Sequence, residues 1–372
     1  MKVQCHREAL LTACSIASAV APVRSPKPIL RNLKLDVQAS GAATLTAFDL
    51  EQGLQYAVSG VTVETPGMAL LPTSQFIAIL REMPDETFRL EATDSGLRIR
   101  GASSKFDLPG EDPTQFPELP KPDAKATFRM PAGKLATMIR RTIFAAATEN
   151  ARFHLASVLM EFEPDGVVRF VATDSKRLAL MPGKAEPAAD MTGAALVSAL
   201  APPKALKLVE RTLQDPEELI EIVLGVNDAR FVGKKVTVYT RLIEGRFPPW
   251  QTVVPKDSKT KVPLVVERIH AAIRQAKIVT SVESKGVKFA FSKGQLTLSA
   301  QGADVGESEV VIPIAYDGAD LEVRFDPDLF AEALKVLDPT EEAQLHLTDS
   351  KKASVLRTGD NYAYVVMPLT GE

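Results

Sequence analysis

The sequence predicts an α+β protein that consists of three tandem copies of one domain. Its 372 residues allow roughly two to four domains. The same order of helix, alternating strands, second helix and further strands occurs three times along the chain. Asp49 and Asp174 occupy equivalent positions 125 residues apart, and Gln301 follows 127 residues later. Because this spacing is far longer than that of solenoid or propeller repeats, each copy is predicted to be a whole domain.

Each copy opens with a predicted amphipathic helix, at residues 7–20, 133–147 and 266–279. In the second of these, Leu135, Met138 and Ile139 recur at helical spacing. A second helix follows later in each copy, at residues 74–83, 203–213 and 328–337. Each helix is expected to turn an apolar face towards the core of its own domain.

Stretches in which apolar and polar residues alternate follow each first helix, beginning at Ile29, Leu155 and Gly286. Short polar turns such as PDG (164–166) and SKG (292–294) interrupt them. This combination indicates antiparallel meanders. Proline-rich segments at 117–126 and 247–263 separate the copies. The predicted domains are therefore residues 1–121, 126–254 and 258–372.

Composition is that of an ordinary globular protein, with 45% hydrophobic residues, 24% charged residues and a mean hydropathy of 0.00. The uncharged stretch from Ala9 to Val23 imitates a signal peptide, but it has two internal counterparts, so we expect a helix and a cytoplasmic protein without membrane contact. Two cysteines, Cys5 and Cys14, are too few for a disulfide framework. Four scattered histidines predict no zinc site.

The formal net charge of −3 shows no global basic excess of the kind typical of nucleic-acid-binding proteins. The predicted helices and their flanks, however, hold 15 basic and 8 acidic residues, a net +7 that leaves −10 for the rest. On one helix Lys204, Lys207 and Arg211 share a face. A solvated face explains any single helix, whereas repetition favours a shared surface for phosphates. The helix at 328–337 does not follow the pattern.

No element that reads bases stands out, so DNA binding is expected to be independent of sequence and sensitive to salt. A protein that stays on DNA through phosphate contacts alone needs another means of retention, such as encirclement. The candidate phosphate contacts are Arg24, Lys134, Arg141, Arg152, Lys204, Lys207, Arg211, Arg274 and Lys277.

Motifs of nucleotide binding and of serine hydrolases (GxxxxGK[ST], GxGxxG and GxSxG) are absent. Asp49, Asp94, Asp174 and Asp349 each end or flank a predicted strand in the contexts AFDL, ATDS, ATDS and LTDS. Clustered carboxylates bind Mg²⁺, so a metal-dependent hydrolase around Asp174 is the enzyme alternative. Their recurrence in separate copies favours turns instead, in which the carboxylate accepts backbone N–H bonds.

Four segments of the chain, taken in this order, are specific enough to indicate a family: PILRNLKLDV (28–37), VATDSKRLAL (171–180), LIEGRFPPWQTVVPK (242–256) and YAYVVMPL (362–369). With them, the whole chain resembles the bacterial DNA polymerase III β subunit, the sliding clamp family. The resemblance implies a ring-shaped head-to-tail homodimer of six DNA-clamp domains, with helices facing a central hole and antiparallel sheets outside. It also implies a non-catalytic protein without cofactor or metal. The implied partners are duplex DNA, the replicative polymerase, the clamp loader and other proteins with a clamp-binding motif.

The resemblance further implies a hydrophobic pocket for partner peptides between the second and third domains. Carried over by position, it comprises Leu155, Thr173, Ser175, Lys176, Arg177, Leu178, Pro248, Val253, Ser354, Val365, Val366, Met367, Pro368 and Leu369. The alternative for the last five is simply a buried final strand. Ser175 and Lys176 stand where Gly and His are common in the family, and Glu149 stands where Gln is common. These departures leave open a specialised clamp that serves repair or a mobile element.

The ring is expected to close where strands near 105–108 of one copy meet strands near 307–310 of another. Opposite charges at the two strands make Lys105 a candidate contact for the two glutamates. The candidate interface residues are Lys105, Phe106, Leu108, Glu307 and Glu309.

Overall fold

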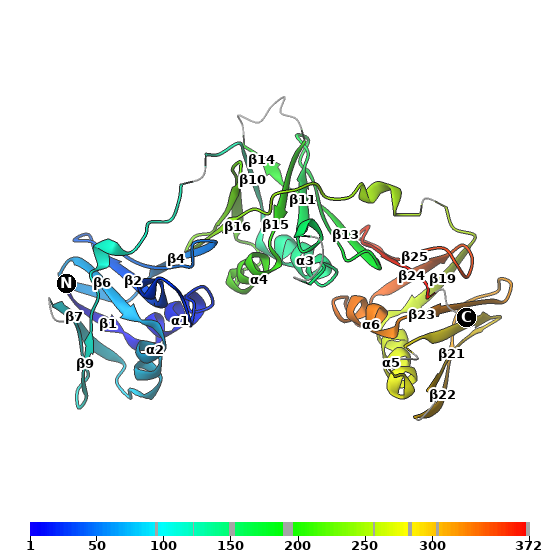
Figure 1. The fold of residues 1–372 in the computed structure, drawn as a ribbon, viewed down its shortest axis with the longest axis horizontal. Coiled ribbons are helices and arrows are strands. Elements are labelled where there is room, and N and C mark those ends of the chain that lie inside the picture. Colours follow the sequence, from blue (N-terminus) through cyan, green and yellow to red (C-terminus); the bar gives the residue numbers. More distant parts are fainter. Residues whose placement is uncertain are drawn as a thin grey trace. The chain divides into compact units, whose positions relative to one another are not determined.

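The computed structural model describes residues 1–93, 96–121, 123–148, 153–188, 196–255, 257–281, 285–302 and 305–369. The chain divides into two compact units, and Figure 1 labels many of the helices and strands of each. The first unit comprises Met1–Gly133, Glu186–Met191 and Lys204–Leu242, and the second comprises Lys134–Ala185, Thr192–Pro203 and Ile243–Glu372. The middle copy of the sequence repeat therefore contributes elements to both units.

The first unit contains two antiparallel sheets. One has the strand order β5 (Val61–Thr65), β1 (Lys2–His6), β7 (Thr87–Thr93), β8 (Gly96–Arg100) and β9 (Lys105–Pro109). The other has the order β14 (Glu186–Pro187), β10 (Ala126–Pro131), β16 (Leu219–Leu224), β17 (Asp228–Val232), β18 (Val236–Arg241), β4 (Gln52–Val58), β3 (Ala43–Phe48), β2 (Asn32–Val37) and β6 (Gly67–Pro72). Helices α1 (Arg7–Ala17) and α2 (Thr73–Glu82) pack against each other, and α4 (Pro203–Thr212) belongs to this unit from Lys204 onwards.

The second unit also contains two antiparallel sheets. One has the order β15 (Val197–Ala201), β11 (Val158–Phe162), β12 (Val167–Thr173), β13 (Arg177–Lys184), β26 (Ala363–Val366), β25 (Ser354–Thr358), β24 (Glu342–Leu347) and β19 (Thr260–Val265). The other has the order β22 (Gly306–Pro313), β21 (Gln295–Gly302), β20 (Val287–Ser292) and β23 (Leu321–Phe325). Helices α5 (Val266–Ala276) and α6 (Pro327–Lys335) pack against each other, and α3 (Ala132–Ile143) belongs to this unit from Lys134 onwards.

Two strand pairs join one copy of the repeat to the next within a continuous sheet. In the first unit, β4 of the first copy pairs with β18 of the second, with Leu54 opposite Val238. In the second unit, β13 of the second copy pairs with β26 of the third, with Ala179 opposite Tyr364. Both junctions are therefore made by backbone hydrogen bonds as well as by side chains.

All six helices lie where the sequence predicts them, but the prediction that a helix opens each copy is wrong. A strand precedes each first helix, namely β1, β10 and β19. Their side chains alternate between core and solvent, as Val3 and Cys5 do on either side of the exposed Gln4. The first helices also end early, because α1 stops at Ala17 and α5 gives way to a 3₁₀ turn at Lys277–Val279.

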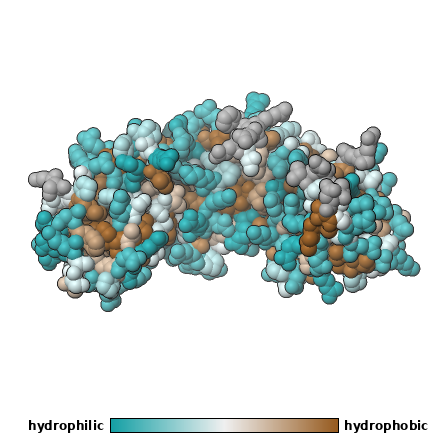
Figure 2. All heavy atoms as spheres, turned by 60° about the horizontal axis from the view of Figure 1, so that its bottom comes forward, coloured by the Kyte–Doolittle hydropathy of each residue, from teal (hydrophilic) through white to brown (hydrophobic). Residues whose placement is uncertain are grey.

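The cores are built from the apolar faces that the sequence predicts. Cys5 and Cys14 are buried free thiols, and burial raises the pKa of Cys5 to about 12. Across the part of the chain that the structure describes, no helix is long and apolar enough to cross a bilayer. Hydrophilic side chains cover most of each unit in the view of Figure 2, and apolar ones show as separate patches.

Candidate peptide surface and nucleic-acid interface

One row of side chains crosses the eight-stranded sheet from the second copy of the repeat into the third. Thr173 lies opposite Leu178, Leu178 opposite Val365, and Val365 opposite Val355. Cross-strand partners share a face of the sheet, so all four point to the same side. Leu178, Val355 and Val365 are buried in one apolar cluster. The register thus brings three of the predicted peptide-binding residues together: Thr173, Leu178 and Val365.

The linker between the second and third copies covers this face. Phe247, Trp250 and Val254 pack against the cluster that contains Leu178 and Val365. Trp250 opens a short 3₁₀ turn (Trp250–Thr252), and its indole N–H donates a hydrogen bond of 3.4 Å to the carboxylate of Glu161. Sequence reasoning did not single out Trp250, although a lone tryptophan between prolines was a usable signal.

Apolar side chains become accessible at the end of β26 and in the linker. Met367 is 43% exposed, Leu369 38% and Val253 43%. The Met367 N–H donates to the Lys176 carbonyl at 2.9 Å, and the Leu369 N–H donates to the Arg324 carbonyl at 2.8 Å. These two bonds tie the segment to the turn before β13 and to β23, and Pro368 between them is buried. The alternative of a wholly buried final strand therefore fails beyond Val366.

Three other predicted peptide-binding residues lie on the opposite face of the sheet. Arg177, Val366 and Ser354 are cross-strand partners in one row. The Arg177 side chain is 9% exposed, bonds Asp174 at 3.0 Å and Glu332 of α6, and donates to the Phe144 carbonyl at 2.8 Å. Arg177 therefore ties the second copy to the third.

Of the remaining predicted residues, Leu155 is buried in the 3₁₀ turn η3 (Phe153–Leu155) and Pro248 is half-buried in the linker. Ser175 and Lys176 are exposed in the turn between β12 and β13, where Ser175 has a φ of +76°. A side chain at this φ is strained, which accounts for the usual preference for glycine in such a turn. The predicted set thus divides among two faces of the sheet, the turn between β12 and β13, the linker, η3 and the segment after β26.

The recurring aspartates act as turn residues, as predicted. Asp49 Oδ1 accepts bonds from the N–H groups of Glu51 and Gln52, at 2.9 and 2.6 Å. Asp174 Oδ1 and Asp349 Oδ1 each accept two such bonds in the same way. Asp94 lies outside the described residues. Within the described ranges, no three His, Cys, Asp or Glu side chains gather in a way that could hold a metal ion.

Helix α4 has the basic face that its spacing predicts. Lys204, Lys207 and Arg211 are exposed, whereas Leu206 and Val209 are buried. Lys204 also bonds Asp49 at 3.2 Å, which still leaves its side chain 66% exposed. The three cations are therefore available to an anionic partner along one side of the helix.

The prediction that Arg141 of α3 is a phosphate contact is wrong, because its side chain is not exposed. This residue is 9% exposed, and its guanidinium bonds Asp360 at 2.6 Å and Glu341 at 2.9 Å. It also lies 5.5 Å from the centre of the Tyr362 ring, within cation–π range. Arg141 is consequently an internal tie between α3 and the third copy and not a phosphate contact. Lys134, at the start of the same helix, is exposed.

The other candidate cations differ in availability. Arg24 and Arg274 are exposed, and Lys277 is half-buried with a bond of 2.8 Å to Asp328 of α6. Arg152 lies outside the described residues, as does Glu149. Arg24 and Arg274 therefore remain candidates on exposure, and Lys277 is already neutralised in part.

Two sheet edges carry the predicted dimer contacts. β9 ends the five-stranded sheet and β22 ends the four-stranded sheet, and no strand of the described chain pairs with the outer side of either. Lys105 and Phe106 of β9 are exposed, and Leu108 is half-buried. Glu307 and Glu309 are exposed on β22. A free strand edge is a template for pairing with another chain.

Three family models match the chain in succession. They describe the N-terminal, central and C-terminal domains of the DNA polymerase III beta subunit, and they match residues 1–120, 129–249 and 251–370. The chain belongs to the DNA polymerase III beta subunit family. The beta sliding clamp of Pseudomonas putida is 29% identical over 98% of both chains, and that of Escherichia coli K12 is 28% identical over 99% of this chain and all of the relative.

Solved structures of the family agree. A DnaN sliding clamp from Pseudomonas aeruginosa superposes with a TM-score of 0.93 at 26% identity, and a DNA polymerase sliding clamp from Bacillus subtilis with 0.92 at 25%. Each likeness covers the whole of both chains. The predicted fold of three tandem clamp domains is therefore confirmed.

Proposed function

We propose that this chain is a sliding clamp without catalytic activity, which forms a head-to-tail homodimeric ring around duplex DNA in the cytoplasm. It tethers the replicative polymerase, the clamp loader and other proteins through peptides that bind beside β26. The observation that carries the proposal is that both junctions between copies are made by the same pair of equivalent strands. The chain has one further strand of each of these two types, and neither is paired at its outer edge. Family membership supports the same conclusion.

The junction rule is a strand pairing. The third strand of the first meander in one copy pairs with the last strand of the next copy, as β4 does with β18 and β13 with β26. The corresponding third strand of the third copy is β22, and the last strand of the first copy is β9. In the described chain, no strand pairs with the outer edge of either of them. Pairing β22 of one chain with β9 of a second extends the rule and closes a ring of two chains.

The rule also fixes a register. Ala47 and Ala172 pair with Leu54 and Ala179, the residues at the centre of the two junctions. We infer that Ala300, which pairs with Ser308, is their equivalent in the third copy. With Ala172 and Ala300 as equivalents, Gln301 corresponds to Thr173. This differs by one residue from the sequence prediction, which matched Gln301 with Asp174. The other strand of each junction contributes Val238 from β18 and Tyr364 from β26. Phe106 of β9 occupies the equivalent position in its own hairpin.

Leu54 faces Val238 and Ala179 faces Tyr364 at the two junctions within the chain. The same rule places Ser308 of one chain opposite Phe106 of a second chain. One residue away along each strand, Glu309 then faces Lys105. Ser308 points into its own domain, because its hydroxyl donates to the Ala276 carbonyl of α5 at 2.8 Å. Phe106 pairs with the buried Ile99 and so lies on the same face of its sheet as Ile99, although it is itself exposed at the sheet edge. Ser308 and Phe106 therefore lie on one side of the proposed ladder, and the oppositely charged Glu309 and Lys105 lie on the other side.

Cysteine pairing tests the interface and its register together. The variant with Lys105→Cys and Glu309→Cys is expected to form disulfide-linked dimers, since directly opposed strand residues bring their Cβ atoms within about 5.5 Å. The control Lys105→Cys with Val311→Cys shifts one cysteine by two residues on the same strand and is expected to cross-link poorly. Monomeric sedimentation of the unmodified chain at micromolar concentration, or equal cross-linking by both pairs, contradicts the proposal.

Retention on DNA tests the ring. After loader-assisted loading, the chain is expected to stay on circular nicked DNA in high salt and to leave the same DNA once it is linearised. Equal loss from both excludes a topological link.

Reversal of the α4 face tests the DNA contact separately. The three changes are Lys204→Glu, Lys207→Glu and Arg211→Glu. Each lost phosphate contact lowers the slope of log K against log salt by about 0.9, so the triple variant should lose about 3 from that slope. A control with the same change in charge alters three exposed lysines outside the helices, namely Lys125→Glu, Lys234→Glu and Lys235→Glu. If both triple variants changed the slope equally, the effect would come from net charge and not from phosphate contacts of α4.

The hydrolase alternative is not favoured. Asp174 already accepts two backbone N–H bonds and pairs with Arg177, so its carboxylate is committed to its own turn.

A further inference from the structure

A small cavity of about 290 Å³ lies on the linker-covered face of the eight-stranded sheet, beside the edge strand β19. Lys261, His346 and Val355 form one cross-strand row of this face, because Lys261 pairs with His346 and His346 with Val355. Arg357, two residues further along β25, lines the same cavity. Val355 also pairs with Val365 on its other side, so the cavity lies across Val355 from the proposed peptide surface.

The cations that line this cavity have no anionic partner of their own. Lys261 is exposed and Arg357 is half-buried, and neither takes part in an ion pair within the described residues. Asp257 is the one acid in the described lining, and its side chain is exposed. Two like charges around one cavity repel each other, and an anion placed between them is attracted to both.

His346 adds hydrogen-bonding capacity that its neighbours leave unused. Its Nδ1 lies 3.3 Å from the Ser258 hydroxyl oxygen, whereas its Nε2 is buried without a hydrogen-bond partner in the described part of the chain. Buried polar atoms are ordinarily paired, because an unpaired one loses its bond to water without replacement. Burial is the main cause that lowers the pKa of His346, and the charges of Arg357 and Lys261 lower it further. A nearby anion would oppose the effect of both cations.

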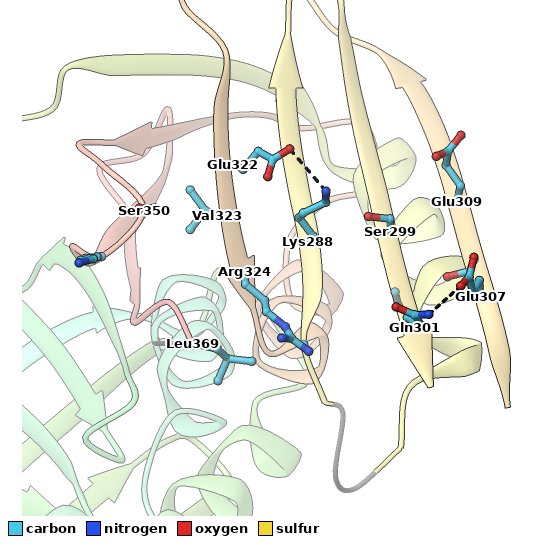
Figure 3. Close-up of a pocket in the computed structure, with 14 residues that line it drawn as sticks. Lys288, Ser299, Gln301, Glu307, Glu309, Glu322, Val323, Arg324, Ser350 and Leu369 are labelled. Atoms are coloured by element: carbon cyan, nitrogen blue, oxygen red, sulfur yellow. Dashed lines mark hydrogen bonds and ion pairs between the residues drawn. The ribbon is translucent and has the colours of Figure 1, made fainter. Parts of the chain in front are cut away.

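The larger cavity of about 910 Å³ on the four-stranded sheet lacks this combination. Figure 3 shows Lys288 bonded to Glu322 at 3.4 Å, and Gln301 Nε2 donating to Glu307 at 2.7 Å. Three cations and three glutamates line that cavity, so its charges balance. It therefore offers no preference for an ion of one sign.

We propose that the smaller cavity binds a small doubly charged oxyanion of the phosphate or sulfate type. The β19 anion site is defined as Lys261, His346 and Arg357. The Arg357 guanidinium has the fork of donors that matches a tetrahedral oxyanion, and Lys261 adds a point charge. The cavity volume lies near the lower limit of about 300 Å³ for ligand pockets, which favours a small ligand. Because the Asp257 carboxylate opposes an anion, binding should be weak and sensitive to salt.

Histidine NMR on the full chain tests this site. The four histidines are isotope-labelled and titrated with acid in sodium chloride, sodium sulfate or sodium phosphate at equal ionic strength. The signal that is missing in His346→Gln identifies His346. Sulfate keeps its charge throughout the titration, so its effect reports on the protein alone.

Sulfate is expected to raise the pKa of His346 and to leave the other three histidines unchanged. An opposite charge within about 4–6 Å favours the protonated form, and we expect the proton affinity of His346 to rise about tenfold. By linkage, sulfate should then bind about tenfold more tightly when His346 is protonated than when it is neutral. Phosphate should act in the same direction.

Removal of the two cations supplies the matched variants. The double change Lys261→Ala with Arg357→Ala should abolish the response, and each single change should weaken it. The control Lys259→Ala alters an exposed lysine of the same linker that does not line the cavity, and it should leave the response unchanged. The signals of the other three histidines show whether each variant is folded.

Two outcomes overturn the inference. One is a pKa of His346 that is the same in sulfate, phosphate and chloride. The other is a response that survives the double change or that Lys259→Ala removes equally, because the anion then binds elsewhere. O-phosphoserine distinguishes the sources of the ligand: a response to it extends the site to phosphate groups on larger molecules, and a response to the inorganic ions alone restricts the site to free ions. The experiment contains neither DNA nor a partner peptide, so its failure leaves the proposed function untouched.

Discussion

Removal of the Arg141 guanidinium offers a sharp test of how the second and third copies are joined. Arg141→Ala leaves Glu341, whose side chain is 19% exposed, and Asp360, at 41%, without their shared cation. Loss of one partner of a fully buried ion pair costs about 3–5 kcal/mol. Because Asp360 is well solvated, we expect a smaller cost of about 2–3 kcal/mol at the β25–β26 hairpin.

Native-state hydrogen exchange measures this cost locally, which suits a chain of several domains that need not unfold in two states. The amides of the β25–β26 hairpin should exchange about 30- to 150-fold faster in Arg141→Ala, since 1.4 kcal/mol corresponds to a factor of ten. Lys134→Ala alters an exposed residue of the same helix and should leave these rates unchanged. Acceleration below threefold, or an equal effect of both variants, would refute the structural role of Arg141.

The same site has a predictable pH dependence. Burial alone would raise the pKa of Asp360, but the Thr358 hydroxyl bond and the Arg141 charge outweigh it and lower the pKa overall. A carboxyl group whose pKa is lowered by folding stabilises the fold above its unfolded pKa, near 4, and this contribution is lost as the pH falls further. In Arg141→Ala the hairpin should lose less protection below pH 4 than in the wild type.

Three further predictions concern the cores. Gly53→Ala should destabilise the first unit, because a Cβ there would lie 2.1 Å from Leu119 Cδ2, and added Leu119→Ala should recover part of the loss in thermal unfolding. Burial, with help from Arg357 and Lys261, lowers the pKa of His346, so stability should fall below about pH 6.5, and His346→Gln should flatten that fall in calorimetry. Cys5 should react with Ellman's reagent only on unfolding, because burial raises its pKa to about 12.

Local patterns predicted the helices and the turns well. The apolar and basic faces of α4 follow from residue spacing alone, and Asp49, Asp174 and Asp349 cap turns as their contexts indicate. These features depend on neighbours within a few positions, which a sequence displays directly. The first strand of each copy was not predicted, because an alternation of only five residues, such as that around Val3, is followed directly by a helix without a turn signal.

Long-range features were harder to predict. Arg141 has the spacing of an exposed helix residue, yet Glu341 and Asp360, about 200 residues away, draw it into the interior. The Ala47, Ala172 and Ala300 equivalence also needed strand pairing, because the repeat differs in loop length between copies.

The two sheets that run across copies of the repeat have a kinetic consequence for the proposed ring. The β4–β18 and β13–β26 ladders are closed by strands of one polypeptide, so if either opens, its strands stay at high effective concentration and re-form without diffusion. The β9–β22 ladder has no such tether, and its re-formation after full separation depends on protein concentration. Dilution therefore slows re-formation at only two of the six junctions of the proposed ring. A loader that opens one of these two opens a junction that no covalent connection helps to close again.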